Sequence, residues 1–190
     1  GRDGVWLDLP TTTEQVQAAL RQIGISSDNP QGLFISGYFA EEEKRFAIPY
    51  NMVLASSVDE LNFLASRLET LSTGERAELN AALQTPQSEL SSIGKITDFP
   101  ENVEYYVHLP DVHGPAQLGD YYLNRSGMVD MPEEWKGGID TAQFGRYVAQ
   151  QEQGAFTQYG YLVKSGDEWQ KVYEGQPVPE EYRVLSFPAP

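Results

Sequence analysis

Cysteine is absent from the 190 residues of the chain, which excludes disulfide bridges, thiolate zinc sites and cysteine nucleophiles. Histidine is almost as scarce, because only His108 and His113 occur. Pro110 between them disfavours a helix, and a spacing of five does not put two imidazoles on one helix face. Protein metal sites need three or four converging ligands. We therefore expect two ordinary loop histidines and no metal site.

Long apolar runs and basic charge are also lacking. No run approaches the ~20 apolar residues that span a bilayer, and no basic and then apolar leader opens the chain, so we expect a cytoplasmic protein. Acidic residues outnumber basic ones 28 to 13, giving a net charge of −15 and a pI near 4.4. Nucleic-acid phosphates and anionic membranes repel such a chain. We expect no direct nucleic-acid binding and no membrane association, and any partner recognised through charge should be basic.

Familiar catalytic and nucleotide-binding motifs do not occur. The sequence has no Gly-x-Ser-x-Gly elbow, no phosphate-binding Gly-x4-Gly-Lys-Ser/Thr loop and no dinucleotide-binding glycine turn. Adjacent carboxylates such as Glu133–Glu134 and Glu180–Glu181 project about 100° apart on a helix, which suits a convergent acid/base pair poorly. We expect no catalytic residues, no cofactor and no enzyme; a hydrolase that uses carboxylates is a minor alternative.

What the chain does contain is typical of folded protein, with 40% apolar and 12% aromatic residues. The patterns predict an α+β fold in an elongated chain of small modules. We expect an N-terminal sheet plus helix in residues 1–56 and a helical module in residues 57–94. A C-terminal sheet with helices follows in residues 95–164, and an aromatic, proline-containing arm in residues 165–190.

The N-terminal module is predicted from three strand-like stretches, residues 4–10, 33–39 and 46–49. Between the first two, a capping box at Thr11-Thr12-Thr13-Glu14 predicts a helix that Gly24 ends.

The helical module is predicted from two further capping boxes, Ser57-Val58-Asp59-Glu60 and Ser72-Thr73-Gly74-Glu75. Acidic residues in the first turns of both helices are favoured by the helix dipole, which explains their type without a function.

In the C-terminal module, residues 103–109 and 155–163 are predicted strands. One helix should begin at Pro115 and end at Gly127, and another should be capped by Asp140 and end at Gly154. The arm that follows carries many aromatic residues, so we expect it to pack over a neighbouring part of the fold.

Negative charge is concentrated between Ile96 and Trp135, where eight acids accompany one base, Arg125. Unpaired carboxylates repel one another and lower stability. We therefore expect these acids to have a function that offsets this cost. A halophilic surface would instead distribute its acids evenly.

Several segments occur in an order that resembles the ArdA-type antirestriction proteins, covering roughly residues 4–164. The first runs from Gly4 to Pro10 and leads into the helix that ends at Ile23-Gly24. The others are Val58-Asp59-Glu60-Leu61-Asn62-Phe63-Leu64-Ala65, Leu118-Gly119-Asp120-Tyr121-Tyr122, Ile139-Asp140-Thr141-Ala142-Gln143-Phe144-Gly145-Arg146 and Gly154-Ala155-Phe156-Thr157. The arm from Ser165 is longer than the usual ending of that family.

The resemblance implies an acidic DNA mimic that dimerises through its C-terminal part and occupies the DNA-binding groove of type I restriction–modification enzymes. The carboxylates expected to replace phosphates are Glu41, Glu42, Glu43, Asp59, Glu60, Glu75, Glu78, Asp98, Glu101, Glu104, Asp111, Asp120, Asp130, Glu133, Glu134 and Asp140. The alternative from another class is an acidic adaptor that binds a basic protein without imitating DNA.

Overall fold

The chain forms two compact units in a computed structural model, which describes residues 4–25, 33–86 and 88–185. Unit 1 combines residues 1–72, 90–101 and 170–190, and unit 2 combines residues 73–89 and 102–169. Neither unit is continuous in sequence, so each is held together by contacts between distant segments.

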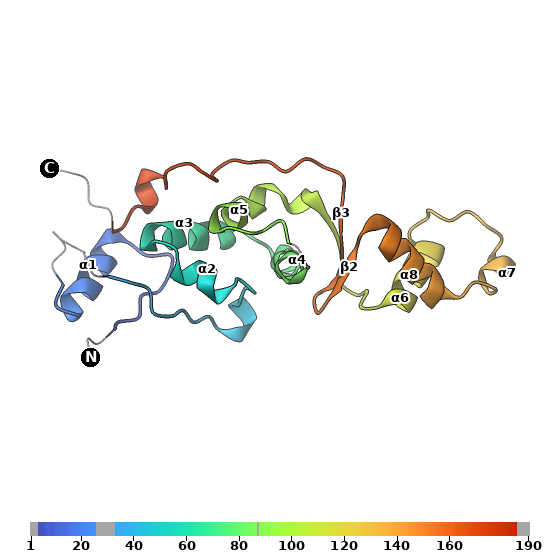
Figure 1. Ribbon diagram of the computed structural model, residues 1–190, viewed down its shortest axis with the longest axis horizontal. Coiled ribbons are helices and arrows are strands. Elements are labelled where there is room, and N and C mark those ends of the chain that lie inside the picture. The colour runs from blue at the N-terminus through green and yellow to red at the C-terminus, as the bar shows by residue number, and fades with distance from the viewer. Residues whose placement is uncertain (1–3, 26–32, 87, 186–190) are drawn as a thin grey trace. The chain divides into compact units, whose positions relative to one another are not determined.

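Unit 1 is built from short helices joined by irregular segments (Figure 1). Its α-helices are α1 (Thr13–Gln22), α2 (Tyr50–Leu54), α3 (Val58–Leu68) and α5 (Ile93–Thr97). Its 3-10 turns are η1 (Glu42–Lys44), η2 (Phe99–Glu101) and η5 (Glu180–Tyr182).

Capping boxes set the starts of α1 and α3. The side chain of Ser57 accepts a hydrogen bond from the Glu60 N–H, and the side chain of Glu60 accepts one from the Ser57 N–H, as the sequence predicts. For α1 the structure shifts the predicted box by one residue, because Thr12 is the N-cap and Gln15 is its reciprocal partner. Glutamine replaces glutamate in this role without changing the geometry.

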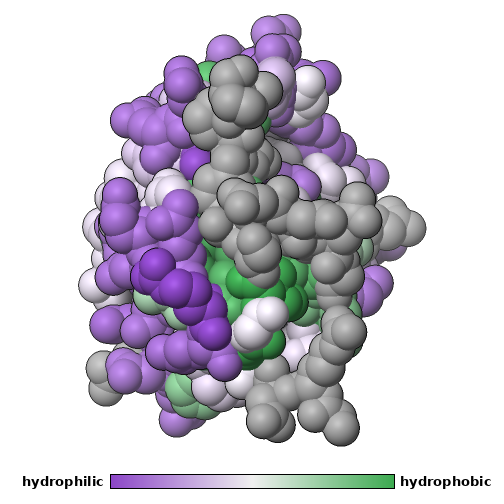
Figure 2. Space-filling model, turned by 90° about the vertical axis from the view of Figure 1, so that its left-hand side faces the viewer, coloured by the Kyte–Doolittle hydropathy of each residue, from purple (hydrophilic) through white to green (hydrophobic). Residues whose placement is uncertain are grey.

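A small apolar core joins α1 to the C-terminal arm. Val16 and Leu20 of α1 are buried together with Val184. Figure 2 views the molecule from the end where α1 lies and shows an apolar area within a largely hydrophilic surface. The core of unit 1 therefore includes residues from near both ends of the sequence.

Unit 2 carries the sheet, with strands β1 (Tyr106–Leu109), β2 (Ala155–Thr157) and β3 (Gly160–Lys164). The strand order is β1-β3-β2 and both pairings are antiparallel, with Val107 opposite Val163 and Phe156 opposite Tyr161. The helices are α4 (Thr73–Gln84), α6 (Pro115–Asp120), α7 (Glu133–Lys136) and α8 (Thr141–Glu152). A 3-10 turn, η3 (Val103–Tyr105), precedes β1, and a π-helical turn, η4 (Tyr121–Arg125), extends α6.

Two glycines let α6 and α8 pack side by side (Figure 1). A Cβ atom at Gly119 would overlap the Thr141 carbonyl, and one at Gly145 would overlap the Pro115 carbonyl. Because the obstacles are backbone atoms, no side-chain rotation can relieve either overlap. The apolar core beside this crossing contains Leu118.

The α+β class is confirmed, but the N-terminal sheet predicted from residues 4–10, 33–39 and 46–49 is wrong. Within the described parts of residues 4–56 the structure has helices and irregular segments and no strand. An alternating sequence forms a strand only when another strand pairs with it, and here none does. In unit 2, the two predicted strands are confirmed in part, since residues 103–105 form a 3-10 turn and residues 155–163 form a hairpin.

Candidate functional site

The exposed carboxylates of unit 2 form the candidate site. Unit 2 contains thirteen acidic and five basic residues. Among the carboxylates that the sequence analysis expects to replace phosphates, those exposed in unit 2 are Glu104, Asp111, Asp120, Asp130, Glu133, Glu134 and Asp140. Short elements present them: Glu133 and Glu134 begin α7, Asp120 ends α6, and Asp140 caps α8 through the N–H groups of its second and third residues.

The two basic residues within this stretch are both paired with members of the set. Lys136 Nζ lies 3.0 Å from Glu133 Oε1, and the lysine side chain is 13% exposed whereas the glutamate side chain is 85% exposed. Arg125 Nε lies 3.8 Å from Asp120 Oδ2, with its guanidinium over the Tyr121 ring. The positive charge of Lys136 is therefore largely covered, while the acids remain open to solvent.

An open pocket of about 470 Å³ lies within this acidic surface. It is lined by Asp111, Ala116, Gln117, Asp120 and Arg125. Its wall carries two carboxylates and one guanidinium, and this net negative charge favours a cationic group of a partner, such as a lysine or arginine side chain.

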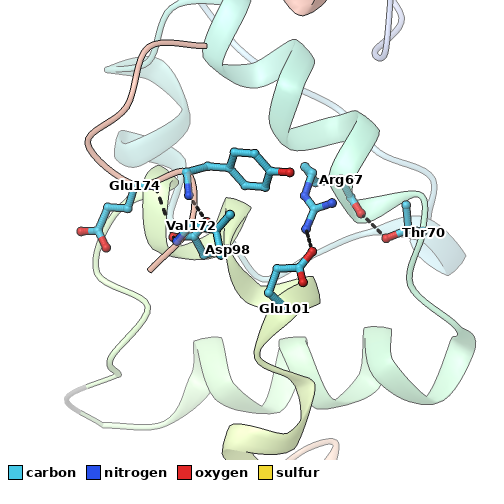
Figure 3. A network of polar contacts seen from close by, with 7 residues as sticks. Arg67, Thr70, Asp98, Glu101, Val172 and Glu174 are labelled. Carbon is cyan, nitrogen blue, oxygen red and sulfur yellow. Dashed lines mark hydrogen bonds and ion pairs between the residues drawn. The ribbon is translucent and has the colours of Figure 1, made fainter. Parts of the chain in front are cut away.

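In unit 1, exposed carboxylates of the set are Glu41 and Glu42 near η1, Glu60 on α3 and Glu101 at the end of η2. Glu60 takes part in the capping box, and Glu101 pairs with Arg67 at 2.8 Å (Figure 3). The side chain of Glu43 lies outside the described residues.

Asp59 and Asp98 must be removed from the candidate surface. Asp59 is 7% exposed and Asp98 is fully buried. Asp98 accepts hydrogen bonds from the backbone N–H groups of residues 172–174, and Asp59 accepts them from residues 184 and 185. A carboxylate enclosed in this way holds the fold together and cannot contact a partner.

Glu75 and Glu78 of α4 are half-buried. Burial raises the pKa of Glu78 to about 8, and the nearby charge of Glu75 adds to the rise. One carboxylate oxygen of Glu78 is buried without a described hydrogen-bond partner. A carboxyl group with this pKa is largely protonated at neutral pH, so Glu78 is a poor substitute for a phosphate.

The histidines show no arrangement suited to chemistry. His108 Nε2 donates to the Tyr159 carbonyl at 2.7 Å, and His113 is exposed. Among the residues that the structure describes, no group of three histidine, aspartate or glutamate side chains is placed to hold a metal ion. Likewise, none of the helices in the described ranges is long and apolar enough to cross a membrane.

Two features of unit 2 were not anticipated from the sequence. Glu152 of α8 accepts hydrogen bonds from the hydroxyls of Tyr122 and Tyr161, and burial raises the pKa of both tyrosines. Met128, Trp135 and Tyr147 expose large apolar side chains, at 74%, 64% and 61%. In the sequence, the only sign of this exposure is that these large apolar residues occur within a stretch of mostly polar ones.

Comparison with known proteins gives one positive finding. A family model described as "Antirestriction protein (ArdA)" matches residues 2–163. The match covers most of the chain and includes all the carboxylates singled out above. No curated protein sequence matches the chain.

Proposed function

The chain belongs to the ArdA family of antirestriction proteins, and we propose that it inhibits type I restriction–modification enzymes by occupying their DNA-binding groove. Antirestriction implies a restriction–modification enzyme as the partner. Such enzymes bind DNA through basic grooves, and an acidic protein can fill a groove of this kind. The proposal places the protein in the cytoplasm, where it acts as an inhibitor without cofactor or turnover.

The exposed carboxylates of unit 2 are the observation that supports this mechanism. Asp111, Asp120, Asp130, Glu133 and Glu134 are exposed. Asp120, Glu133 and Glu134 lie on short helices and the other two on connecting segments, and the two bases in this stretch, Arg125 and Lys136, are paired. A dispersed set of anions resembles a phosphate backbone more than a single binding pocket does. Glu41, Glu42, Glu60 and Glu101 of unit 1 extend the proposed set, together with Glu104 and Asp140.

The first experiment removes four negative charges from the proposed surface and compares the effect with removal of the same number elsewhere. A variant with Asp120→Asn, Asp130→Asn, Glu133→Gln and Glu134→Gln should inhibit DNA cleavage by a type I enzyme more weakly than the unchanged protein. The matched control neutralises four exposed acids outside the proposed set: Asp8, Glu69, Asp167 and Glu181. Equal losses in both variants would refute a defined mimic surface, because total charge alone would then explain binding.

The second experiment separates DNA mimicry from an acidic adaptor. The protein is titrated against duplex DNA for binding to the same enzyme at several salt concentrations. If both ligands fill one basic groove, they exclude each other and lose affinity together as salt rises. An adaptor anchored by aromatic side chains would bind alongside DNA and keep its affinity through moderate salt.

We propose further that the protein is a homodimer that associates through unit 2. Two chains of net charge −15 repel each other, so a dimer needs an apolar contact. Trp135 of α7 and Tyr147 of α8 expose such side chains. Trp135→Ala should shift sedimentation toward the monomer, whereas Trp6→Ala, at an exposed tryptophan of unit 1, should not. Equal sedimentation of all three proteins would exclude this interface.

A further inference from the structure

The C-terminal arm of the structure has no counterpart in the family match, which ends at residue 163. We call its residues 170–185 the strap. The strap belongs to unit 1, where it runs along α5 and α3 toward α1 (Figure 1). Two separate groups of hydrogen bonds hold it.

The first group is the α5 latch, centred on Asp98 at the C-terminal end of α5. Its Oδ1 accepts from the Tyr173 N–H at 2.7 Å, and its Oδ2 accepts from the N–H groups of Val172 at 3.1 Å and Glu174 at 3.2 Å (Figure 3). Hydrogen bonds to a buried carboxylate are strong because no water competes for the charge. The ring of Tyr173 lies 4.9 Å from the Arg67 guanidinium, which closes this end of the strap over α3.

The second group is the α3 latch, formed by Asp59 and Asn62 of α3. Asp59 Oδ1 accepts from the N–H groups of Val184 and Leu185, each at 2.8 Å. Asn62 donates from Nδ2 to the Tyr182 carbonyl at 3.0 Å and accepts at Oδ1 from the Thr11 N–H at 2.7 Å. One buried amide therefore connects the strap to the segment that leads into α1.

The two latches differ in what else they hold. The α5 latch fixes the strap to α5 and α3, and none of its described contacts reaches α1. The α3 latch places Val184 in the buried cluster with Val16 and Leu20, both on α1. Phe63 lies between the latches, with its ring 4.9 Å from that of Tyr173 and 5.0 Å from that of Tyr182.

From this arrangement we propose that the two latches have separate roles: the α3 latch positions α1, and loss of the α5 latch frees residues 172–174 without displacing α1. The hydrogen bonds are made by the main chain of the strap, so each latch depends on the side chains of α3 or α5 that pair with it. The proposal rests on these contacts and not on the proposed antirestriction mechanism.

The test is amide hydrogen exchange on the full chain, followed residue by residue. Asp98→Asn keeps the shape of the side chain but turns an amide N–H₂ toward backbone donors. Exchange at residues 172–174 should rise at least about tenfold, while amides of α1 and of residues 184 and 185 keep their protection. Asp130→Asn, at an exposed carboxylate of unit 2, is the matched control and should change neither set.

Asp59→Ala tests the other half of the proposal. It should raise exchange at residues 184 and 185 and throughout α1, while protection in β3 of unit 2 reports that the chain is otherwise folded. If α5 also loses protection in this variant, the milder Asn62→Ala replaces it. Asn62→Ala should loosen α1 and Tyr182 together.

Three outcomes would overturn the proposal. The first is unchanged exchange at residues 172–174 in Asp98→Asn, which would mean that the carboxylate does not hold the strap. The second is an equal rise throughout unit 1 in that variant, because the latches would not then be independent. The third is protected α1 amides in both Asp59→Ala and Asn62→Ala, because the strap would not then position α1.

Discussion

Replacing Gly145 by alanine is the sharpest test of how unit 2 is packed. Alanine ordinarily stabilises a helix relative to glycine by up to about 1 kcal/mol. At Gly145, however, the new Cβ would overlap the Pro115 carbonyl and lie 2.9 Å from the Gly119 nitrogen. Both atoms belong to the backbone of α6, so the helices must move apart.

The expected cost follows from that separation. Overpacking of a close contact lowers stability by about 1–3 kcal/mol, which outweighs the gain in helix propensity. We expect Gly145→Ala to lower the stability of unit 2 by about 1–2 kcal/mol. For a unit of this size each kcal/mol corresponds to about 4–8 °C in melting temperature.

The measurements are the free energy of unfolding from thermal and denaturant melts, and the amide exchange rates of α6 and α8. Gly74→Ala is the matched control, because it lies in α4 with no atom within 4 Å of a new Cβ. That variant should be neutral or slightly stabilised. If Gly145→Ala behaved like Gly74→Ala, the close crossing of α6 and α8 would be wrong. Adding Gly119→Ala to Gly145→Ala should cost less than the sum of the single changes, because the helices are already separated.

Three further predictions concern single side chains. Tyr161→Phe removes a buried hydroxyl that donates to Glu152 and should lower the free energy of unfolding by about 1.5–3 kcal/mol, measured with denaturant. Unchanged stability would mean that this hydrogen bond does not stabilise the fold. Glu78 has a folded pKa of about 8, above its ordinary value, so the folded state binds the proton more tightly and stability falls as pH rises from about 4.5 to 8. Glu78→Gln should therefore be as stable as the unchanged protein at pH 4 and more stable at pH 8, and parallel pH profiles would contradict the raised pKa. Glu133→Gln alone should change inhibition by only a few tenths of a kcal/mol, whereas complete loss from one folded substitution would indicate a catalytic or metal site.

Local signals in the sequence predicted the local structure well. The capping box at Ser57, the N-cap at Asp140 and the proline-initiated helix at Pro115 are all confirmed. Each depends on residues within one helical turn, so the sequence contains the whole cause. The turn at residues 158 and 159, which divides one predicted strand into a hairpin, is missed because Gly160 sits within an otherwise strand-like run.

Features that depend on distant residues could not be predicted. Residues 33–39 alternate like a strand, yet pairing requires a second strand that no local pattern specifies. Asp59 and Glu60 are neighbours on one helix and look equivalent in sequence. The structure buries Asp59 against Val184 and Leu185, which lie more than a hundred positions later in the chain, and it leaves Glu60 exposed. The candidate surface could therefore be predicted only as a set of acids, from which the fold removes individual members.

The division of unit 1 among three separated segments affects when this unit can fold during synthesis on the ribosome. Synthesis runs from the N-terminus, and domains generally fold as their residues emerge. Helices α1 and α3 emerge early, but Val184, which shares their core, is added more than a hundred residues after α3 is complete. Unit 2, in contrast, ends at residue 169 and can form first. The buried cluster of unit 1 can therefore be completed only after Val184 has been added, and a single cut between residues 72 and 73 or between 169 and 170 separates segments that unit 1 needs.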